Sequence, residues 1–192
     1  SRAMPPERIH VIYHGIDVAH YEPFLSDSVV LAPNQVITVG NWLRDWAFYK
    51  EVIATAQTKH PDLKFILVNR SLNQGVLEEL RAFPNFIYKT DVSDQGLIQL
   101  LQESKVHFLP LIEATANNSV MESLAVGCPL VMPNIFSSHY QLNNAAIHFY
   151  APLVVEEALM KIDFLCQLDK EAYQKLQEEA NNVSKKTAAR AN

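Results

Sequence analysis

The sequence predicts an α/β domain built on a doubly wound parallel sheet. Short apolar runs rich in β-branched residues alternate with longer amphipathic segments, as expected for repeated strand–helix–strand units. The short runs are apolar throughout, which is typical of strands that are buried on both faces. Strands are predicted at residues 9–13, 35–39, 64–68, 86–88, 106–109, 129–132 and 147–150.

Amphipathic segments connect these strands, and several carry residues that mark their ends. Ser93 and Asp169 are predicted to cap the helices that follow them. Gly127 stands where helices commonly end, and Pro129 prevents the helix from continuing. Helices are predicted at residues 46–58, 74–82, 94–103, 118–126, 155–165 and 170–185. Ligands of such sheets bind at the carboxyl ends of the strands, so we expect the site in the loops after residues 39, 68, 88 and 109.

Composition narrows the class of partner. The chain has 192 residues and a formal net charge of −5, which fits one domain and argues against a large basic surface. We therefore expect no nucleic-acid partner and at most peripheral membrane contact. No run approaches the roughly 20 apolar residues of a membrane-spanning helix. The two cysteines lack metal-ligand spacing, which favours a reducing, cytoplasmic location.

The first part of the chain has a different character, because prolines interrupt it and only one short apolar run is present. We interpret residues 1–33 as an interdomain linker with a first strand, which enters from a preceding domain. Residues 34–192 are interpreted as the ligand-binding domain.

The segment after the fifth predicted strand is a candidate phosphate site. There a strand ends, a loop of small polar residues follows, and a helix begins, so that unpaired N–H groups favour an anion. Glu122, about one turn into the helix, is placed to accept hydrogen bonds from ribose hydroxyls. A capping box, with Ser119 as the cap and Glu122 bonding back to it, is the alternative. The candidate phosphate-binding residues are Thr115, Ala116, Asn117, Asn118 and Ser119.

A second candidate follows the strand at residues 35–39. Gly40 permits a turn there, and Arg44 supplies a cation suited to planar, bidentate phosphate contacts. The alternative is that Arg44 pairs with Asp45 or another surface acid. Trp42 and Trp46 are expected to be core or interface anchors rather than ligand platforms.

A third candidate is the turn at Asp91 and Val92, whose backbone groups are placed to contact a nucleobase. A plain capped turn is the alternative reading of this segment. The histidines show no metal-ligand spacing, and His107, which alternates inside a strand, is expected in the core. We expect neither a metal nor a cofactor.

Four segments, in order, resemble motifs of one family. Residues 8–17, with Tyr21 and Pro23, resemble a linker written Ile-Pro-Asn-Gly-Val-Asp and then Phe-x-Pro, and residues 36–40 resemble a strand ending in Val-Gly-Arg. Residues 92–94, Val-Ser-Asp, resemble the start of Val-Ser-Asp-Glu-Glu-Leu. The most specific match is Met-Glu-Ser-Leu-Ala-Val-Gly-Cys-Pro-Leu-Val at residues 121–131, similar to Leu-Glu-Ala-Met-Ala-Cys-Gly-Thr-Pro-Val-Val. The chain thus resembles the Rossmann-like C-terminal domain of GT-B retaining glycosyltransferases, the glycosyl transferases group 1 family.

This resemblance implies retaining, metal-independent glycosyl transfer from a nucleotide sugar, UDP- or GDP-linked, in polysaccharide biosynthesis. It implies that Glu122 holds the ribose, that Arg44 and the helix start stabilise the departing diphosphate, and that Glu113 contacts the sugar. The acceptor would be bound by an N-terminal domain outside this chain. We therefore expect this domain alone to bind the donor and to transfer nothing.

The sequence departs from the family pattern at three positions. Asn41 and Trp46 stand where the family has arginine and lysine, and Ala114 stands where it has the first glutamate of a pair. The missing cations favour an alternative function, a non-catalytic nucleotide-binding regulatory domain. A sugar-nucleotide epimerase or phosphorylase of the same architecture is a further alternative.

Overall fold

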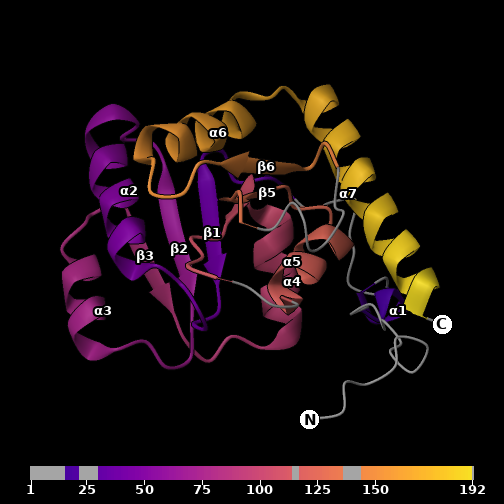
Figure 1. Cartoon of the computed structure of the whole chain (residues 1–192), viewed down its shortest axis with the longest axis horizontal. Helices are drawn as coiled ribbons and strands as arrows, with labels where there is room; N and C mark the ends of the chain where they lie inside the picture. Colours follow the sequence, from indigo (N-terminus) through magenta and orange to yellow (C-terminus); the bar gives the residue numbers. More distant parts are fainter. Residues whose placement is uncertain (1–15, 22–29, 114–116, 136–143, 192) are drawn as a thin grey trace, which may run out of the picture.

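The computed structural model describes residues 16–21, 30–113, 117–135 and 144–191, and forms a six-stranded sheet with helices on both faces (Figure 1). The strand order is β3-β2-β1-β4-β5-β6, and every neighbouring pair is parallel. The predicted doubly wound α/β class is therefore confirmed. The strands are β1 (Gln35–Val39), β2 (Lys64–Val68), β3 (Phe86–Lys89), β4 (Val106–Phe108), β5 (Leu130–Pro133) and β6 (Ile147–Tyr150).

The helices also follow the predicted pattern. Each predicted helix is present, with ends that shift by a residue or two except in the last helix, which is six residues longer. A short helix that was not predicted lies within the expected linker, and the strand predicted at residues 9–13 falls outside the described residues. The helices are α1 (Val18–Tyr21), α2 (Trp46–Lys59), α3 (Gln74–Arg81), α4 (Asp94–Glu103), α5 (Asn118–Ala125), α6 (Val155–Gln167) and α7 (Lys170–Ala191).

Polar caps explain where several helices begin. The side chain of Asp45 accepts a hydrogen bond from Phe48 N at 2.9 Å, and the hydroxyl of Ser93 accepts one from Gly96 N at 3.1 Å. Asp169 caps α7 through the amide of Ala172 at 2.8 Å. These groups satisfy amides that have no partner within the helix. The predicted caps at Ser93 and Asp169 are thus confirmed.

The end of α5 confirms the expected glycine position. Gly127 has φ +78°, a left-handed conformation that glycine adopts without steric cost. Its amide donates to the carbonyl of Leu124 at 3.2 Å, which closes the last turn before β5.

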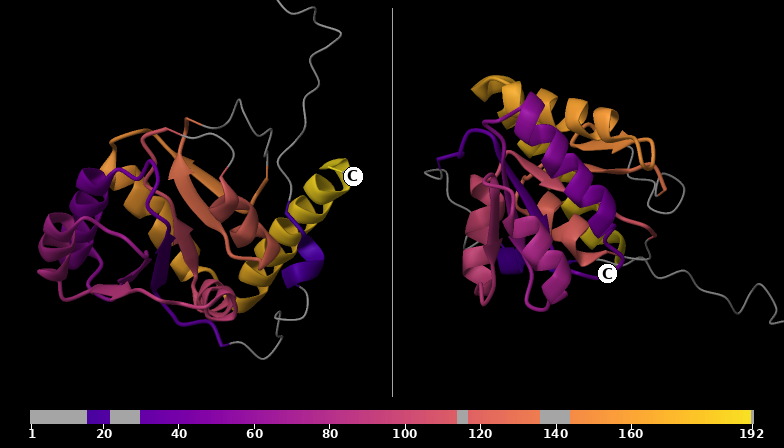
Figure 2. Two further views of the ribbon diagram at one scale, coloured as in Figure 1. Left: turned by 90° about the horizontal axis from the view of Figure 1, so that it is seen from below. Right: turned by 90° about the vertical axis from the view of Figure 1, so that its left-hand side faces the viewer.

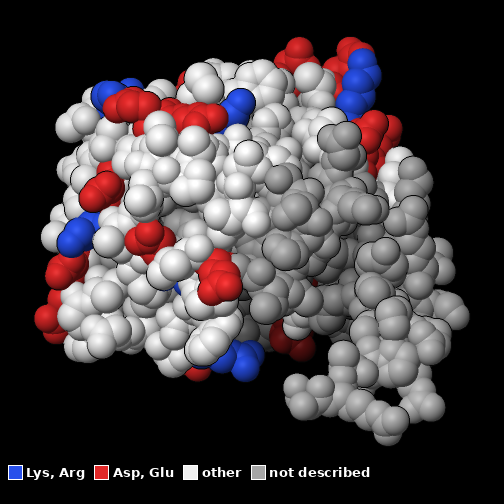
Figure 3. Space-filling model, in the orientation of Figure 1, with Lys and Arg blue, Asp and Glu red and all other residues white. Residues whose placement is uncertain are grey.

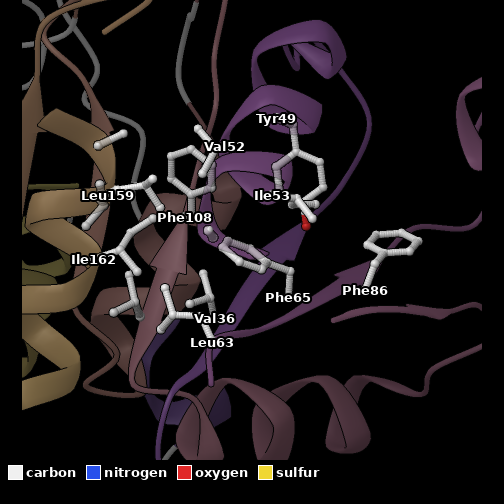
Figure 4. Packing of buried hydrophobic residues seen from close by; sticks show 14 of the residues in the cluster. Val36, Tyr49, Val52, Ile53, Leu63, Phe65, Phe86, Phe108, Leu159 and Ile162 are labelled. Carbon is white, nitrogen blue, oxygen red and sulfur yellow. The ribbon is translucent and has the colours of Figure 1, made fainter. Parts of the chain in front are cut away.

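The helices form two layers around the sheet (Figure 2). Buried residues of α2, α3 and α6 share one hydrophobic cluster, whereas α4, α5 and α7 contribute to clusters on the opposite face. In the larger cluster, Tyr49, Val52 and Ile53 of α2 lie over the sheet residues Val36 and Phe65 (Figure 4). Burial of this apolar surface is the main force that holds α2 against the sheet.

Stacked aromatic rings fix the start of α2 relative to β4 and β6. The rings of Phe48 and Tyr150 stack with centroids 5.4 Å apart, and those of Tyr49 and Phe108 stack at 6.0 Å. Offset aromatic pairs of this kind add about 0.5–1.5 kcal/mol to burial. Because Phe48 is in the first turn of α2, this packing also places the β1–α2 loop that precedes it.

The C-terminal helix is tied to the N-terminal end of β4, opposite the carboxyl edge where the sequence predicts the site. The buried hydroxyl of Tyr173 bonds with the carbonyl oxygens of Ser104 and Lys105 at 3.1 and 3.0 Å. The Lys105 ammonium lies 4.3 Å from the centre of the Tyr173 ring. Helix α7 also contacts α1, and the two are adjacent in Figures 1 and 2.

The order of the strands reverses between β1 and β4. The chain leaves β1 toward α2 on one face and leaves β4 toward α5 on the other. Open α/β sheets bind ligands at such a switch point.

Charge and hydropathy add two observations. The face shown in Figure 3 has acidic and basic side chains interspersed, without a continuous basic area over the described residues. Within the described ranges, no helix combines the length and the apolar character that crossing a bilayer requires.

Candidate functional site

Two loops meet at the switch point between β1 and β4. Arg44, in the β1–α2 loop, forms an antiparallel bridge with Leu111, in the β4–α5 loop. The amide of Asp45 donates to Pro110 O at 2.7 Å, and the amide of Ile112 donates to Leu43 O at 3.0 Å. The backbone therefore holds the two loops together, as the sheet topology requires for a shared site.

The side chain of Arg44 is buried beneath this junction, with 6% of its surface exposed. Its Nη1 donates to Trp42 O at 2.9 Å, and its Nη2 donates to Val39 O at 2.7 Å and to Ser119 Oγ at 3.4 Å. The guanidinium thus connects the end of β1 with the first turn of α5. Its Nε is buried without a hydrogen-bond partner among the described residues.

The positive charge of Arg44 has no acidic partner within the described part of the chain. The expected alternative, a pair with Asp45, is wrong: Asp45 caps α2 through Phe48 N instead. Burial lowers the pKa of Arg44 to about 10, so the guanidinium remains charged near neutral pH. A buried, unpaired charge is costly, and it favours a site that receives an anion.

His107 lies in the core, as predicted. It does not neutralise the positive charge of Arg44. Burial, with a smaller contribution from Arg44, lowers the pKa of His107 to about 3. The imidazole is therefore neutral at physiological pH, and neither of its nitrogens has a partner among the described residues.

The start of α5 differs from the capping-box alternative. Asn117 is the cap, and its side chain accepts a hydrogen bond from Ser119 N at 3.0 Å. The capping box with Ser119 as the cap is therefore wrong, because the Ser119 hydroxyl faces Arg44 instead. The amide of Val120 is also occupied, by Asn117 O at 3.1 Å. The amides of Ser119 and Val120 are therefore already hydrogen-bonded. Arg44 and the Ser119 hydroxyl are the groups that we now expect to contact an anion.

The remaining predicted phosphate residues have different positions. Asn118 is the exposed first residue of α5. Thr115 and Ala116, together with Ala114, lie outside the described residues.

A cavity of about 300 Å³ lies at the carboxyl ends of β1, β2 and β3, and it is lined by Gly40 but not by Arg44. Gly40, Asp91 and Val92, three residues that the sequence indicated, line this cavity. Its apolar wall includes Val39 and Leu97, and polar or charged side chains surround them. The cavity therefore offers both an apolar surface and hydrogen-bonding groups to a flat ligand.

Gly40 joins the cavity to the guanidinium. Its φ is +86°, and a Cβ atom at this position would lie 3.3 Å from Arg44 Nη2 and 3.8 Å from Ser119 Oγ. A side chain would therefore strain the backbone and press on the guanidinium, whereas its contact with Ser119 Oγ would be an ordinary one. The close approach explains why a glycine follows β1.

Asn69 is a residue of the cavity that the sequence analysis did not identify. It is 4% exposed, its amide nitrogen donates to Gly40 O at 3.3 Å, and its amide oxygen accepts from Ser71 N at 2.8 Å. The hydroxyl of Tyr88 donates to Asn69 O at 2.7 Å. A polar residue directly after an apolar strand was the available signal, and Asn69 thereby fixes the loop beside Gly40.

Glu122 is half-buried on α5 and is not among the residues that line the cavity. Burial raises its pKa, and the carboxylate of Asp94, which lines the cavity, raises it further. The pKa of Tyr21, from the linker segment, rises to about 12 through burial and the nearby charges of Glu122 and Asp94. The linker thus reaches the neighbourhood of the predicted ribose contact.

Glu113 and Trp42 lie on the outer side of the loop junction. Glu113 is exposed, and it is not among the hydrogen-bond partners that Arg44 has within the described ranges. Trp42 is 79% exposed, so a core position is wrong for this residue, and its expected role as an interface anchor stays a prediction. Trp46, by contrast, is partly buried against the main core cluster. Among the described residues, no group of three or more His, Cys, Asp or Glu side chains is arranged to hold a metal ion.

Comparisons with known proteins support the fold. Neither a scan of protein-family models nor a search of curated proteins gives a match. Solved structures do match. The N-terminal domain of Candida albicans trehalose-6-phosphate phosphatase has a TM-score of 0.74 at 11% identity, over 94% of this chain and 47% of that chain. A mutant of S. aureus TarM, in complex with fondaparinux, α-GlcNAc-glycerol and UDP, has a TM-score of 0.74 at 14% identity, over 96% of this chain and 36% of that chain.

A third match is a domain of similar length. The C-terminal domain of LpcC, a glycosyl transferase group 1 family protein from Francisella tularensis, has a TM-score of 0.67 at 10% identity, over 90% of this chain and 97% of that domain. This chain has the Rossmann-like fold of the C-terminal domains of GT-B glycosyltransferases. It spans less than half the length of the first two structures. Identities at this level establish the fold alone, because one fold hosts many activities.

Proposed function

We propose that this chain binds a nucleoside diphosphate sugar at the carboxyl ends of β1, β3 and β4, as the donor-binding part of a retaining, metal-independent glycosyltransferase. The neighbouring structures support the glycosyltransferase architecture, and one of them was solved with UDP. The residues around Arg44 support the ligand class.

The observation that carries this proposal is the buried charge of Arg44. Its guanidinium lies at the junction of two loops, has no acid partner among the described residues, and is next to the Ser119 hydroxyl. A diphosphate bound there would provide the missing negative charge. Guanidinium groups suit phosphate because their N–H donors match two oxygen atoms at once.

The same charge would assist transfer. When the bond between the anomeric carbon and the phosphate oxygen breaks, negative charge grows on the departing diphosphate. A fixed cation in a water-poor site stabilises this growing charge without reorganisation. The family that this chain resembles has an arginine and a lysine where this chain has Asn41 and Trp46. Arg44 would take the role of those two cations.

The cavity lined by Gly40 is proposed to hold the nucleoside. Gly40 would allow the diphosphate to approach, and the apolar wall near Val92 would contact the base. Glu122 would accept hydrogen bonds from the ribose hydroxyls, because its half-buried carboxylate interacts with the charge of Asp94, which lines the cavity. Glu113 would contact the sugar on the outer side of the junction.

Calorimetric titration tests this function. The chain is titrated with UDP, GDP, ADP and CMP, and with the corresponding nucleosides. We expect one diphosphate to bind and its nucleoside to bind at least tenfold more weakly, since a charged hydrogen bond contributes about 1.5–3 kcal/mol. The second measurement is transfer of the sugar to an acceptor. It is made on the full-length protein, because the proposed acceptor domain lies outside this chain.

The outcomes separate the candidate functions. Selective binding with transfer by the full-length protein supports the glycosyltransferase. Selective binding without transfer or any change in the sugar supports the non-catalytic regulatory domain, which the residues Asn41 and Trp46 favour. Absence of binding by both the chain and the full-length protein contradicts the proposal.

A further inference from the structure

The exposed indole of Trp42 is the feature that the proposed function leaves unexplained. Its side chain is 79% exposed, although it stands on the loop whose other residues form the anion site. Exposed tryptophan is uncommon on free surfaces, and its large flat face is typical of binding sites.

The backbone holds Trp42 in a defined position. Its carbonyl oxygen accepts a hydrogen bond from Arg44 Nη1 at 2.9 Å. The next residue, Leu43, has φ +54°, a left-handed conformation that a leucine adopts only where its surroundings impose it. The carbonyl of Leu43 accepts from Ile112 N at 3.0 Å, which anchors this conformation to the neighbouring loop. The indole therefore projects from a fixed base.

Trp42 and Glu113 stand at matching positions on the two bridged loops. The antiparallel bridge joins Arg44 and Leu111, and two positions outward along each segment stand Trp42 and Glu113. Both side chains are exposed, so an indole and a carboxylate lie on the outer side of the loop junction above Arg44.

This pair has the chemistry of a sugar subsite. The face of an indole is electronegative and attracts the C–H groups on one side of a pyranose ring. A carboxylate next to it accepts hydrogen bonds from the ring hydroxyls. We propose that Trp42 is a specificity-determining platform that stacks on the pyranose ring of the donor sugar, on the assumption that the diphosphate binds at Arg44 as proposed above.

The surroundings of Trp42 favour a sugar over a protein partner. The exposed residues of the two bridged loops include Asn41 and Glu113, and the apolar Ile112 is 63% exposed. The cores of protein interfaces are depleted of charged residues, whereas sugar sites combine one aromatic face with several hydrogen-bonding groups.

The test compares nucleotides with and without a sugar. The chain and its variants Trp42→Ala, Trp42→Phe and Ile112→Ala are titrated with UDP, UDP-glucose and UDP-N-acetylglucosamine, and with GDP and GDP-mannose. We expect one sugar nucleotide to bind more tightly than its diphosphate. Trp42→Ala should remove this gain, about two- to tenfold, and leave the diphosphate affinity unchanged. Trp42→Phe should retain most of the gain in affinity that the sugar provides, and Ile112→Ala should retain all of that gain.

Fluorescence gives a second readout. The chain has two tryptophans, so Trp46→Phe leaves Trp42 as the only indole. Its emission should change when the sugar nucleotide binds and remain constant when the diphosphate alone binds.

The outcomes distinguish this inference from the proposed function. If a diphosphate binds and Trp42→Ala lowers the affinities for diphosphate and sugar nucleotide equally, or lowers neither, the platform is wrong and the diphosphate site stands. If Ile112→Ala removes the gain as fully as Trp42→Ala, the surface is an apolar docking face and the platform is wrong. If no diphosphate binds, the proposed function and the platform both fail.

Discussion

The guanidinium Nη2 of Arg44 lies 3.4 Å from the hydroxyl oxygen of Ser119, a residue 75 positions away in the chain. This contact joins the loop after β1 to the first turn of α5, across the point where the strand order reverses. It brings together a buried charge, a hydroxyl group and the glycine-lined edge of a cavity. The following predictions test this arrangement.

Replacement of Arg44 by methionine should lower the affinity for the nucleoside diphosphate by about 10- to 150-fold, the equivalent of 1.5–3 kcal/mol for a charged hydrogen bond. The affinity for the nucleoside should not change, because it has no phosphate. Titration calorimetry measures both. Arg81→Met, at the exposed end of α3, is the matched control and should have no effect. Equal losses for diphosphate and nucleoside would contradict the assigned role.

Replacement of Gly40 by alanine should reduce both stability and nucleotide affinity. The left-handed backbone costs an alanine about 1–2 kcal/mol, and the new Cβ would lie 3.3 Å from Arg44 Nη2. Gly127→Ala is the control, because Gly127 has a similar φ of +78° far from the guanidinium. Denaturant unfolding should show a similar loss for both variants, and only Gly40→Ala should weaken binding. Normal nucleotide binding by Gly40→Ala would separate this glycine from the site.

Replacement of Glu122 by glutamine should stabilise the fold and weaken the nucleotide complex. Burial and Asp94 raise the pKa of Glu122, so the folded state binds a proton more readily than the unfolded state. Stability is then lost as the pH rises from the unfolded pKa of about 4.3 through the folded value. Urea unfolding should therefore show no difference between the variant and the parent at pH 4, and a gain for the variant at pH 7.

A nucleotide without ribose hydroxyls tests the binding role of Glu122 separately. The Glu122→Gln variant should lose affinity for the diphosphate but not for its 2′,3′-dideoxy form. If the variant loses the same affinity for both, Glu122 acts through the protein structure and not through the ribose.

Replacement of His107 by leucine should make the fold less sensitive to acid. The pKa of His107 is lowered to about 3, against about 6.5 for an unfolded chain. Its contribution to stability is therefore complete above the unfolded pKa and is lost as the pH falls from there toward 3, by at most about 1.4 kcal/mol per pH unit. Unfolding free energies measured between pH 7 and pH 4 should fall less steeply for His107→Leu. Parallel pH profiles would show that the imidazole gains a proton within the folded protein.

The sequence by itself determined the strand and helix pattern, because local chemistry encodes it. Continuous apolar runs predicted the buried parallel strands, and Ser93, Asp169 and Gly127 predicted helix ends that the structure confirms. The four-residue helix α1 was not predicted, since a single turn has no hydrophobic periodicity to detect.

The candidate site was only partly predictable. Gly40, Arg44 and Val92 were identified because each directly follows, or nearly follows, an apolar strand. Asn69 also directly follows an apolar strand, but the sequence analysis did not identify it. Its role depends on the hydrogen bond to Gly40 O, 29 residues away, together with the one it accepts from Ser71 N, and the first of these forms only in the folded chain.

Only the tertiary structure decided the hydrogen-bond partners of Arg44, Asp45 and Ser119, because the local sequence allows more than one partner for each. Locally, Asp45 could neutralise Arg44 and Ser119 could cap α5. In the folded chain Asp45 caps α2, Asn117 caps α5, and the two remaining groups, Arg44 and Ser119, meet each other. The physical reason is that strand order and burial set these distances. Residues far apart in the sequence come together when β1 pairs with β4, and no local pattern records that pairing.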